Sequence, residues 1–284
     1  MLPDMDSFQR AGLTFDVRDG GPADGQTVVL LHGFPQGSES WDAVTPRLNA
    51  DGYRTLAPDQ RGYSPGARPQ ARRDYAMDEL VADVLALADA AGADRFHLVG
   101  HDWGGGVAWA VATEAPERLH SLTSVSTPHP RAMTDAMLRS NQALRSWYML
   151  LFQLPWLPEK AILARGGEQF VRQMVAEGLP EEKARGYVRR LQQPGAATAE
   201  INWYRALALG LTRNRTAAPV RVPTLYVWSD GDRYLGRTAA DLTRRWVDAP
   251  YRFEVLTGVN HWIPELAADH LATLLLDHFE HRAA

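Results

Sequence analysis

The chain has 284 residues, enough for one large α/β domain or for a core domain with an insertion. Its 45% hydrophobic and 23% charged residues are typical of an ordinary globular protein, and its net charge of −4 gives no basic field to recruit nucleic acid or an anionic membrane. The absence of cysteine excludes disulfides, thiolate metal sites and a cysteine nucleophile.

The N-terminal sequence MLPDMDSFQR has neither a basic stretch nor an apolar stretch of the kind found in signal peptides. No apolar run approaches the roughly 20 residues that cross a bilayer. Together with the lack of cysteine, these features predict a cytoplasmic protein that inserts into no membrane.

Short runs rich in β-branched residues alternate with helical patterns, which predicts a mostly parallel sheet flanked by helices. Several runs are apolar throughout, as expected of strands covered on both faces. A helical stripe covers Met77–Ala91, and a last helix is predicted to begin at Pro264, a residue that suits a first turn. The expected strands are Leu13–Arg18, Thr27–Leu31, Tyr53–Ala57, Arg95–Val99, Leu119–Val125, Thr224–Trp228 and Arg252–Leu256.

The alternation of strands and helices breaks between Pro130 and Pro219. This stretch has helical patterns, contains several prolines and is rich in aromatic residues. We therefore expect residues 1–129 and 219–284 to form a core domain, and residues 130–218 to form an inserted helical cap over the sheet. Most aromatic side chains of this segment are expected to build the core of the cap itself.

One predicted strand runs directly into Gly100-His101-Asp102-Trp103-Gly104. This is the nucleophile-elbow pattern, glycine-x-nucleophile-x-glycine, with aspartate as the nucleophile. The tight turn requires the glycines, presents Asp102, and turns the N–H of Trp103 toward the same space as an oxyanion donor. Taken alone, the motif also fits a phosphate-binding turn or a plain helix N-cap.

Three further features each follow a predicted strand, and the nucleophile, acid and histidine occur in that order along the chain, as the elbow pattern requires. His32-Gly33-Phe34-Pro35 follows an apolar strand, where the N–H of Phe34 would be the second oxyanion donor. Asp230 and Asp232 follow a later strand as candidate acids, and His261 follows the last one as candidate base. Since the nucleophile, acid and base are all side chains, and no histidines show metal-ligand spacing, we expect neither a cofactor nor a metal.

A carboxylate nucleophile indicates attack on an electrophilic sp³ carbon, because attack on an acyl carbon would give an anhydride. The product would be an ester on Asp102, hydrolysed by a water that His261 activates. Epoxides and alkyl halides both suit this chemistry. The leaving oxygen of an epoxide needs O–H donors, whereas a halide needs only N–H donors.

The motifs HGFP, DQRGYSPGARP, GHDWGG, WSDGD and GVNHW together resemble the α/β-hydrolase-fold epoxide hydrolases over nearly the whole chain. The resemblance implies the α/β-hydrolase fold and the conversion of a small apolar epoxide and water to a vicinal diol. It also implies Asp232 as the acid, with Asp230 as the alternative. Two cap tyrosines would hold the epoxide oxygen: Tyr204, within NWYR, and Tyr148, at the start of YMLLFQ.

Two alternatives remain open at this point. The related haloalkane dehalogenases use the same nucleophile, and Trp103 or one of the cap tryptophans Trp147, Trp156 and Trp203 would be their halide donor. One of their subgroups has asparagine where this chain has Phe34, which weakens that reading. A non-catalytic binding protein on the same fold is the other alternative, although a pure binder has no need of a strained elbow. We expect no nucleic-acid partner, and the sequence does not define the oligomeric state.

Overall fold

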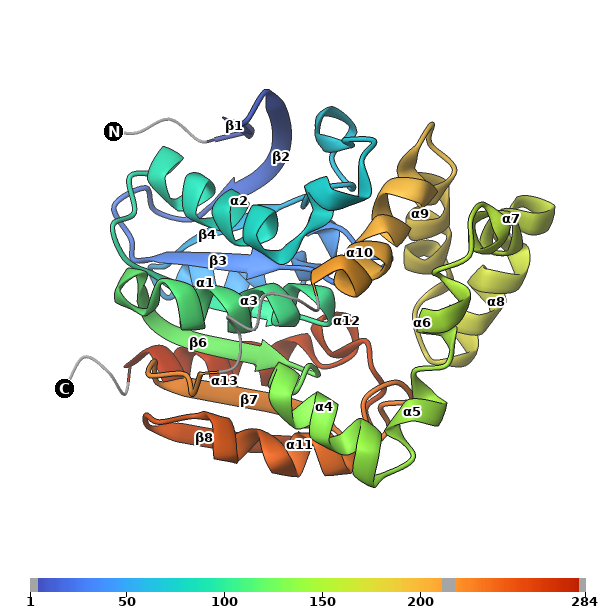
Figure 1. Cartoon of the computed structure of the whole chain (residues 1–284). Coiled ribbons are helices and arrows are strands. Elements are labelled where there is room, and N and C mark those ends of the chain that lie inside the picture. The colour runs from blue at the N-terminus through green and yellow to red at the C-terminus, as the bar shows by residue number, and fades with distance from the viewer. Residues whose placement is uncertain (1–4, 211–217, 281–284) are drawn as a thin grey trace.

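The core of the molecule is an eight-stranded, mostly parallel sheet (Figure 1). The computed structural model describes residues 5–210 and 218–280. The strand order is β1-β2-β4-β3-β5-β6-β7-β8; β2 is antiparallel to β1 and to β4, and the other neighbours are parallel. The strands are β1 (Ser7–Arg10), β2 (Leu13–Gly20), β3 (Thr27–Leu31), β4 (Arg54–Pro58), β5 (Phe96–His101), β6 (Leu119–Val125), β7 (Thr224–Ser229) and β8 (Tyr251–Leu256).

All seven predicted strands are present, and β3 and β6 have the predicted ends. The prediction of a mostly parallel sheet flanked by helices is therefore confirmed. Strand β1 was not expected from the sequence. Of its four residues only Phe8 is buried, so this short edge strand has no apolar run from which it could be predicted.

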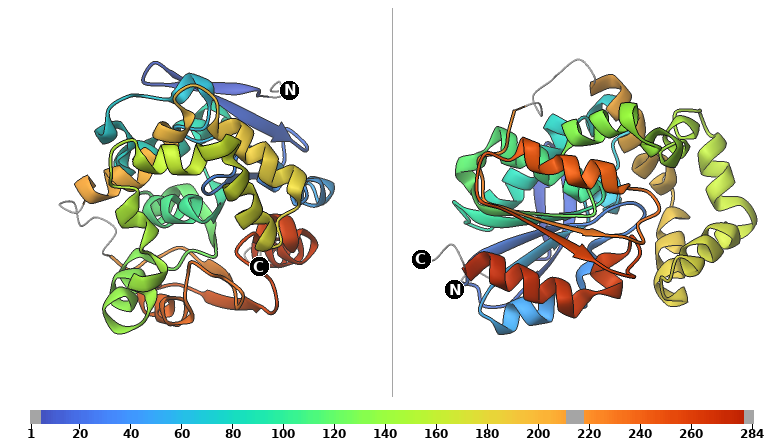
Figure 2. Two further views of the ribbon diagram at one scale, coloured as in Figure 1. Left: turned by 90° about the vertical axis from the view of Figure 1, so that its right-hand side faces the viewer. Right: turned by 90° about the horizontal axis from the view of Figure 1, so that it is seen from below.

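Apolar strands bury side chains on both faces of the sheet. Along β3, Val29 and Leu31 pack toward α2 (Met77–Ala90) and α3 (Trp103–Glu114), whereas Val28 and Leu30 pack on the opposite face, toward α1 (Thr45–Ala50) and α13 (Ala268–Glu280). Figure 2 shows these helical layers above and below the strands. Because both faces are covered, all five residues of β3 are buried and the four that follow Thr27 are apolar.

The prediction of one continuous C-terminal helix beginning at Pro264 is wrong. The chain forms α12 (Ile263–Leu266) and then α13, separated at Ala267, whose φ of −133° and ψ of 33° are not helical. Pro264 does lie in the first turn of α12. A break of one residue leaves the apolar periodicity intact on both sides, so the pattern does not reveal it.

In the described part of the stretch between β6 and β7, residues 126–210 and 218–223, seven helices lie beyond the carboxyl ends of the strands (Figure 1). The last of them, α10, also packs on the core, since the indole N–H of Trp203 donates a 2.7 Å hydrogen bond to the carbonyl of Arg61. Domain boundaries at 130 and 218 stay a prediction, and residues 211–217 lie outside the described residues. The seven helices are α4 (Pro130–Arg139), α5 (Gln142–Arg145), α6 (Tyr148–Leu151), α7 (Leu157–Leu163), α8 (Glu168–Ala176), α9 (Glu181–Leu191) and α10 (Ala196–Gly210).

The remaining helices are short. Helix α11 (Arg237–Leu242) follows β7. Within residues 5–210 and 218–280, no helix combines the length and hydrophobicity needed to span a membrane. Short 3₁₀ helices cover Ser38–Trp41, Pro65–Ala67, Arg72–Tyr75, Pro116–Arg118, Ala164–Gly167 and Thr243–Trp246.

Candidate active site

Asp102 occupies the sharp turn between β5 and α3. Its φ of 50° and ψ of −120° form a backbone conformation that residues with a side chain rarely adopt. A Cβ on Gly100 would lie 2.2 Å from the carbonyl oxygen of Gly104, and a Cβ on Gly104 would lie 2.3 Å from that of Leu31, so the turn requires both glycines. The Asp102 side chain makes no capping bond to α3 and instead lines a cavity.

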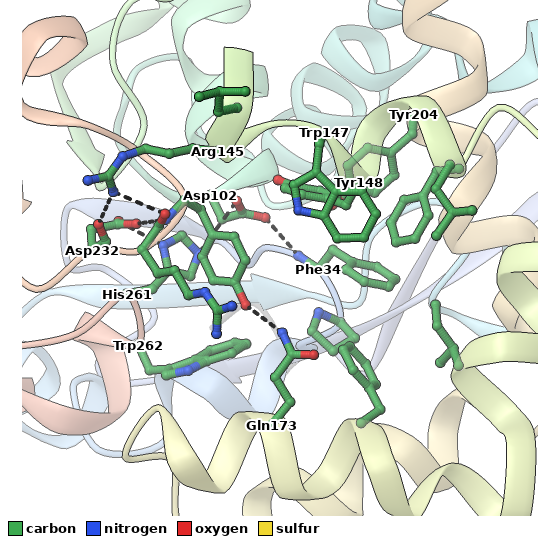
Figure 3. Close-up of a pocket in the computed structure, with 18 of the residues that line it drawn as sticks. Phe34, Asp102, Arg145, Trp147, Tyr148, Gln173, Tyr204, Asp232, His261 and Trp262 are labelled. Carbon is green, nitrogen blue, oxygen red and sulfur yellow. Dashed lines mark hydrogen bonds and ion pairs between the residues drawn. The ribbon is translucent and has the colours of Figure 1, made fainter. Parts of the chain in front are cut away.

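His261 lies between two carboxylates (Figure 3). Its Nδ1 is 2.8 Å from Oδ2 of Asp232, and its Nε2 is 3.5 Å from Oδ2 of Asp102. Burial favours the neutral imidazole, but Asp232 and Asp102 outweigh burial and raise the pKa of His261 well above its ordinary value. Burial likewise opposes ionisation of Asp102, whereas His261 and the N–H of Phe34 lower its pKa to about 2. Asp102 is therefore a carboxylate at neutral pH.

The structure places Asp232, rather than Asp230, against the imidazole. The second oxygen of Asp232 accepts hydrogen bonds from the backbone N–H groups of Tyr234 at 2.8 Å and Leu235 at 2.9 Å. Arg145 holds the same loop by donating to the carbonyl of Asp232 at 2.9 Å. Asp230 is exposed, and its carboxylate accepts a 2.7 Å bond from the N–H of Gly258 across the turn. Asp230 therefore stabilises the turn in which His261 stands.

The backbone N–H of Phe34 lies at the Asp102 carboxylate, and Trp103 directly follows Asp102 in the chain. The N–H of Phe34 donates to Oδ1 of Asp102 at 3.0 Å. Gly33 permits this approach, since a Cβ there would lie 2.3 Å from Cβ of Asp102. Trp103 is the first residue of α3, where an N–H has no acceptor within the helix. Their role as an oxyanion hole stays a prediction.

The cavity has a volume of about 800 Å³ and is largely apolar on the side of the cap segment. It contains six of the seven predicted site residues. The seventh, Trp103, has its side chain in a neighbouring cavity of about 440 Å³ that shares the walls formed by Asp102, Tyr148 and Tyr204. The lining of the larger cavity includes Phe34, Asp102, Tyr148, Tyr204, Asp232 and His261, with Trp147, Leu151, Phe152, Ile162 and Phe170 among its apolar members.

Tyr148 and Tyr204 face the same cavity as Asp102, with ring centres 6.1 Å apart (Figure 3). Burial raises the pKa of both hydroxyls well above the ordinary value, and the negative charge of Asp102 adds to the effect. Both therefore keep their protons at neutral pH. The indole of Trp103 packs edge-on against the ring of Tyr204, with ring centres 4.9 Å apart. Among the described residues, no hydrogen bond takes up the proton of either tyrosine, so both remain donors for a ligand.

A buried hydrogen-bond network behind the cavity was not expected from the sequence. Oε1 of Gln36 accepts from the N–H of Gly33 at 3.1 Å and lies 2.8 Å from Nδ1 of His101. Nε2 of Gln36 donates to Glu265 at 2.7 Å. The other ring nitrogen of His101 is 2.9 Å from the carbonyl of His261. The network thus fixes the backbone beside Phe34 and the backbone of His261 at the same time.

Gln36 is fully buried, and its replacement by leucine tests this network. The N–H of Gly33 would lose its acceptor and the adjacent N–H of Phe34 would shift, so we expect turnover to fall by about 10- to 100-fold, less than the loss of a whole oxyanion donor. Steady-state kinetics on purified protein would show the fall in kcat. Tyr187→Phe, which removes a 2.7 Å hydrogen bond to Glu265, is the comparison variant. If Gln36→Leu kept a normal kcat and Tyr187→Phe lowered it, the network would act through the cap and not through Gly33.

The acids and the histidine around Asp102 are not arranged as a set of metal ligands. Across the parts of the chain that the structure describes, no three histidine, aspartate or glutamate side chains are grouped as metal ligands. Asp102 and Asp232 instead each lie against one ring nitrogen of His261.

The elbow, the acid–histidine pair and the sheet topology define the class of α/β-hydrolase-fold proteins. The sequence model of the α/β hydrolase fold family matches residues 26–268. The crystal structure of epoxide hydrolase A from Mycobacterium thermoresistibile superposes with a TM-score of 0.84 at 25% identity, covering 96% of each chain.

Curated relatives narrow the class. The chain is 34% identical to the AB hydrolase superfamily protein YfhM of Bacillus subtilis, over 95% of this chain and 96% of the relative. It is 33% identical to epoxide hydrolase 3 of Xenopus tropicalis, over 90% of this chain and 71% of the relative. The chain therefore belongs to the α/β-hydrolase-fold epoxide hydrolase family.

Proposed function

We propose that this chain hydrolyses an apolar epoxide to a vicinal diol through an ester on Asp102. The observation that carries the proposal is the pairing, in one cavity, of an ionised carboxylate with two tyrosine hydroxyls whose protons are free to donate. The names of the relatives, several of which are epoxide hydrolases, support the same reaction.

In the first step, Tyr148 and Tyr204 donate hydrogen bonds to the epoxide oxygen while a carboxylate oxygen of Asp102 attacks one ring carbon. A C–O ester bond forms and the ring C–O bond breaks. The alkoxide that leaves takes a proton from a tyrosine hydroxyl. His261, which is protonated in the free enzyme, supplies the proton that restores the tyrosine.

Ester formation itself prepares the base for the second step. It neutralises Asp102, so one of the two carboxylates that raise the pKa of His261 is lost and the imidazole releases its proton. Neutral His261 then takes a proton from a water that attacks the ester carbonyl. The N–H groups of Phe34 and Trp103 stabilise the resulting oxyanion. As it collapses, the ester C–O bond breaks and the leaving oxygen takes the second proton of the water, which releases the diol, restores the Asp102 carboxylate and leaves His261 protonated as in the free enzyme.

The donors in the cavity favour epoxides over alkyl halides. Of the tryptophans considered as halide donors, Trp203 donates its N–H to the carbonyl of Arg61 and Trp156 does not line the cavity, whereas Trp147 does line it. Trp103 lines the neighbouring cavity rather than the larger one. The two tyrosine hydroxyls are therefore the groups that favour an epoxide oxygen. A parallel assay of diol formation from epoxides and of halide release from haloalkanes tests the choice. We expect diol formation; halide release without diol formation would overturn the proposal.

The two chemical steps should respond differently to pH. Asp102, with a pKa of about 2, stays ionised down to about pH 4, so ester formation should change little as the pH falls from neutrality. Ester hydrolysis needs neutral His261 and should slow as the pH falls. We therefore expect a larger fraction of the protein to carry the ester during turnover at about pH 5 than at about pH 8, measured by acid quenching and intact-protein mass spectrometry. Equal ester fractions would contradict the role of His261.

A further inference from the structure

Exposed large apolar side chains are concentrated in one part of the cap segment. Seven of them lie between residues 138 and 157, with exposed fractions of 41% to 83%. Elsewhere in residues 5–210 and 218–280, Val175, Leu207 and Leu266 are exposed to between 37% and 43%. Single exposed apolar residues are ordinary, but a concentration of them marks an interaction site. We name these seven residues the apolar cap surface: Leu138, Leu144, Trp147, Leu150, Leu154, Trp156 and Leu157.

The apolar cap surface adjoins the mouth of the active-site cavity. Leu144 and Trp147 line the cavity and are also 77% and 62% exposed, so they lie where the cavity opens to solvent. Helices α5, α6 and α7, which carry or flank most of these residues, follow one another along the side of the cap in Figure 1. A molecule that enters the cavity at this mouth passes these exposed side chains.

Within the chain segment that carries the apolar cap surface the charges are mostly positive; Asp135 and Glu168 flank the segment, and Glu168 is paired with Arg185 at 2.7 Å. Between residues 138 and 165 the charged residues are Arg139, Arg145, Lys160 and Arg165 against one glutamate, Glu159. That glutamate is already paired with the buried Arg205 at 2.7 Å. The Nζ of Lys160 lies 4.5 Å from the ring centre of Trp156, which joins the positive and the aromatic parts of the surface. This local charge is opposite in sign to the net charge of −4 of the chain.

We propose that the apolar cap surface docks onto an anionic lipid surface, from which an apolar substrate passes directly into the cavity. Exposed leucine and tryptophan flanked by arginine and lysine is the composition of protein surfaces that lie on anionic membranes. A second copy of the chain is disfavoured as the occupant. It would bring Arg139, Lys160 and Arg165 against their own counterparts and would cover the cavity mouth. The delivery of substrate rests on the proposed epoxide reaction; the docking does not.

Co-sedimentation with lipid vesicles, without substrate, tests the docking. The chain should bind vesicles of phosphatidylcholine mixed with phosphatidylglycerol, bind vesicles of pure phosphatidylcholine weakly, and be released by high salt. The triple variant Leu150→Ser, Trp156→Ser, Leu157→Ser should lose binding, whereas Val175→Ser, an exposed apolar residue on α8, should bind normally. Lys160→Gln and Arg165→Gln should each lower the partition coefficient about fivefold on the anionic vesicles.

Turnover separates docking from catalysis, because none of the three serine substitutions lies in the cavity lining. The triple variant should hydrolyse a water-soluble epoxide at the normal rate but lose rate with an epoxide dissolved in anionic vesicles. Docking is overturned if the chain shows no preference for anionic vesicles, if the triple variant binds normally, or if light scattering shows a dimer that the triple variant disperses. A chain that docks but forms no diol would overturn the proposed function and leave the docking intact.

Discussion

With His261 replaced by glutamine, the chain should accumulate a covalent ester on Asp102 when an epoxide is supplied, and turnover should fall by about 10³-fold or more. The attack by Asp102 needs a carboxylate but no base, and the N–H of Phe34, which donates to Oδ1 of Asp102, still stabilises that carboxylate when His261 is absent. Hydrolysis of the ester needs a proton acceptor, which glutamine cannot be. Intact-protein mass spectrometry should show a mass increase equal to the epoxide, and peptide mapping should place the increase on Asp102.

The double variant Asp102→Asn, His261→Gln should carry no adduct, which separates the ester from other alkylated side chains. His129→Gln is a matched control, because His129 is as buried as His261 but does not line the cavity. It should keep turnover and form no trapped ester. Failure of His261→Gln to trap an adduct with any member of a varied epoxide panel would argue strongly against the covalent route.

The part of the candidate site on the sheet could be predicted from the sequence because each of its residues is local to one strand end, whereas Tyr148 and Tyr204 lie on helices α6 and α10 and were expected only from the family resemblance. Gly100 and Gly104 indicate a turn in which neither position has room for a Cβ, and that turn alone sets the position of Asp102. Phe34 and His261 follow strands of the same sheet, so the topology brings them to the same edge. The strands themselves are visible because both faces are covered, which makes their sequences buried at every position and largely apolar.

The buried network could not be predicted, because it depends on side chains that are distant in sequence. Gln36 meets His101 across 65 positions and Glu265 across 229. Glu265 reaches Gln36 from α12, whose separation from α13 at Ala267 leaves no mark in the apolar pattern. Whether Asp230 or Asp232 meets His261 is likewise decided by the turn, since the two side chains accept hydrogen bonds from different backbone groups.

The charge of the whole chain does not describe its individual faces. A net charge of −4 is a sum over 284 residues, and it hides the segment between 138 and 165 in which basic residues outnumber acidic ones four to one. Electrostatic attraction to a surface decays over about a Debye length, roughly 8–10 Å in physiological salt. The charge of the face that approaches a membrane therefore matters more than the total.

Replacing both cavity tyrosines, Tyr148→Phe with Tyr204→Phe, should lower epoxide turnover by about 10⁴-fold or more, because one donor to a developing oxyanion contributes about 10²- to 10³-fold. The rings would keep their packing, while both protons available to the ring oxygen would be lost. The loss should fall on ester formation, so His261→Gln carrying the two substitutions should show little adduct. Rapid-quench measurement of adduct formation checks this.

Tyr234→Phe is the matched control for the tyrosine pair. Tyr234 lines the same cavity and packs on His261 with ring centres 5.1 Å apart, but its hydroxyl already donates to Glu177 at 2.9 Å. Its proton is thus committed within the protein, and its loss should lower turnover by less than about tenfold. A tyrosine pair variant that formed ester at the normal rate would remove both hydroxyls from the reaction. Opening of an epoxide ring needs O–H donors to the leaving oxygen. If the pair variant formed ester at the normal rate, the leaving group of the substrate would need no such donor, and the proposal of an epoxide substrate would fail.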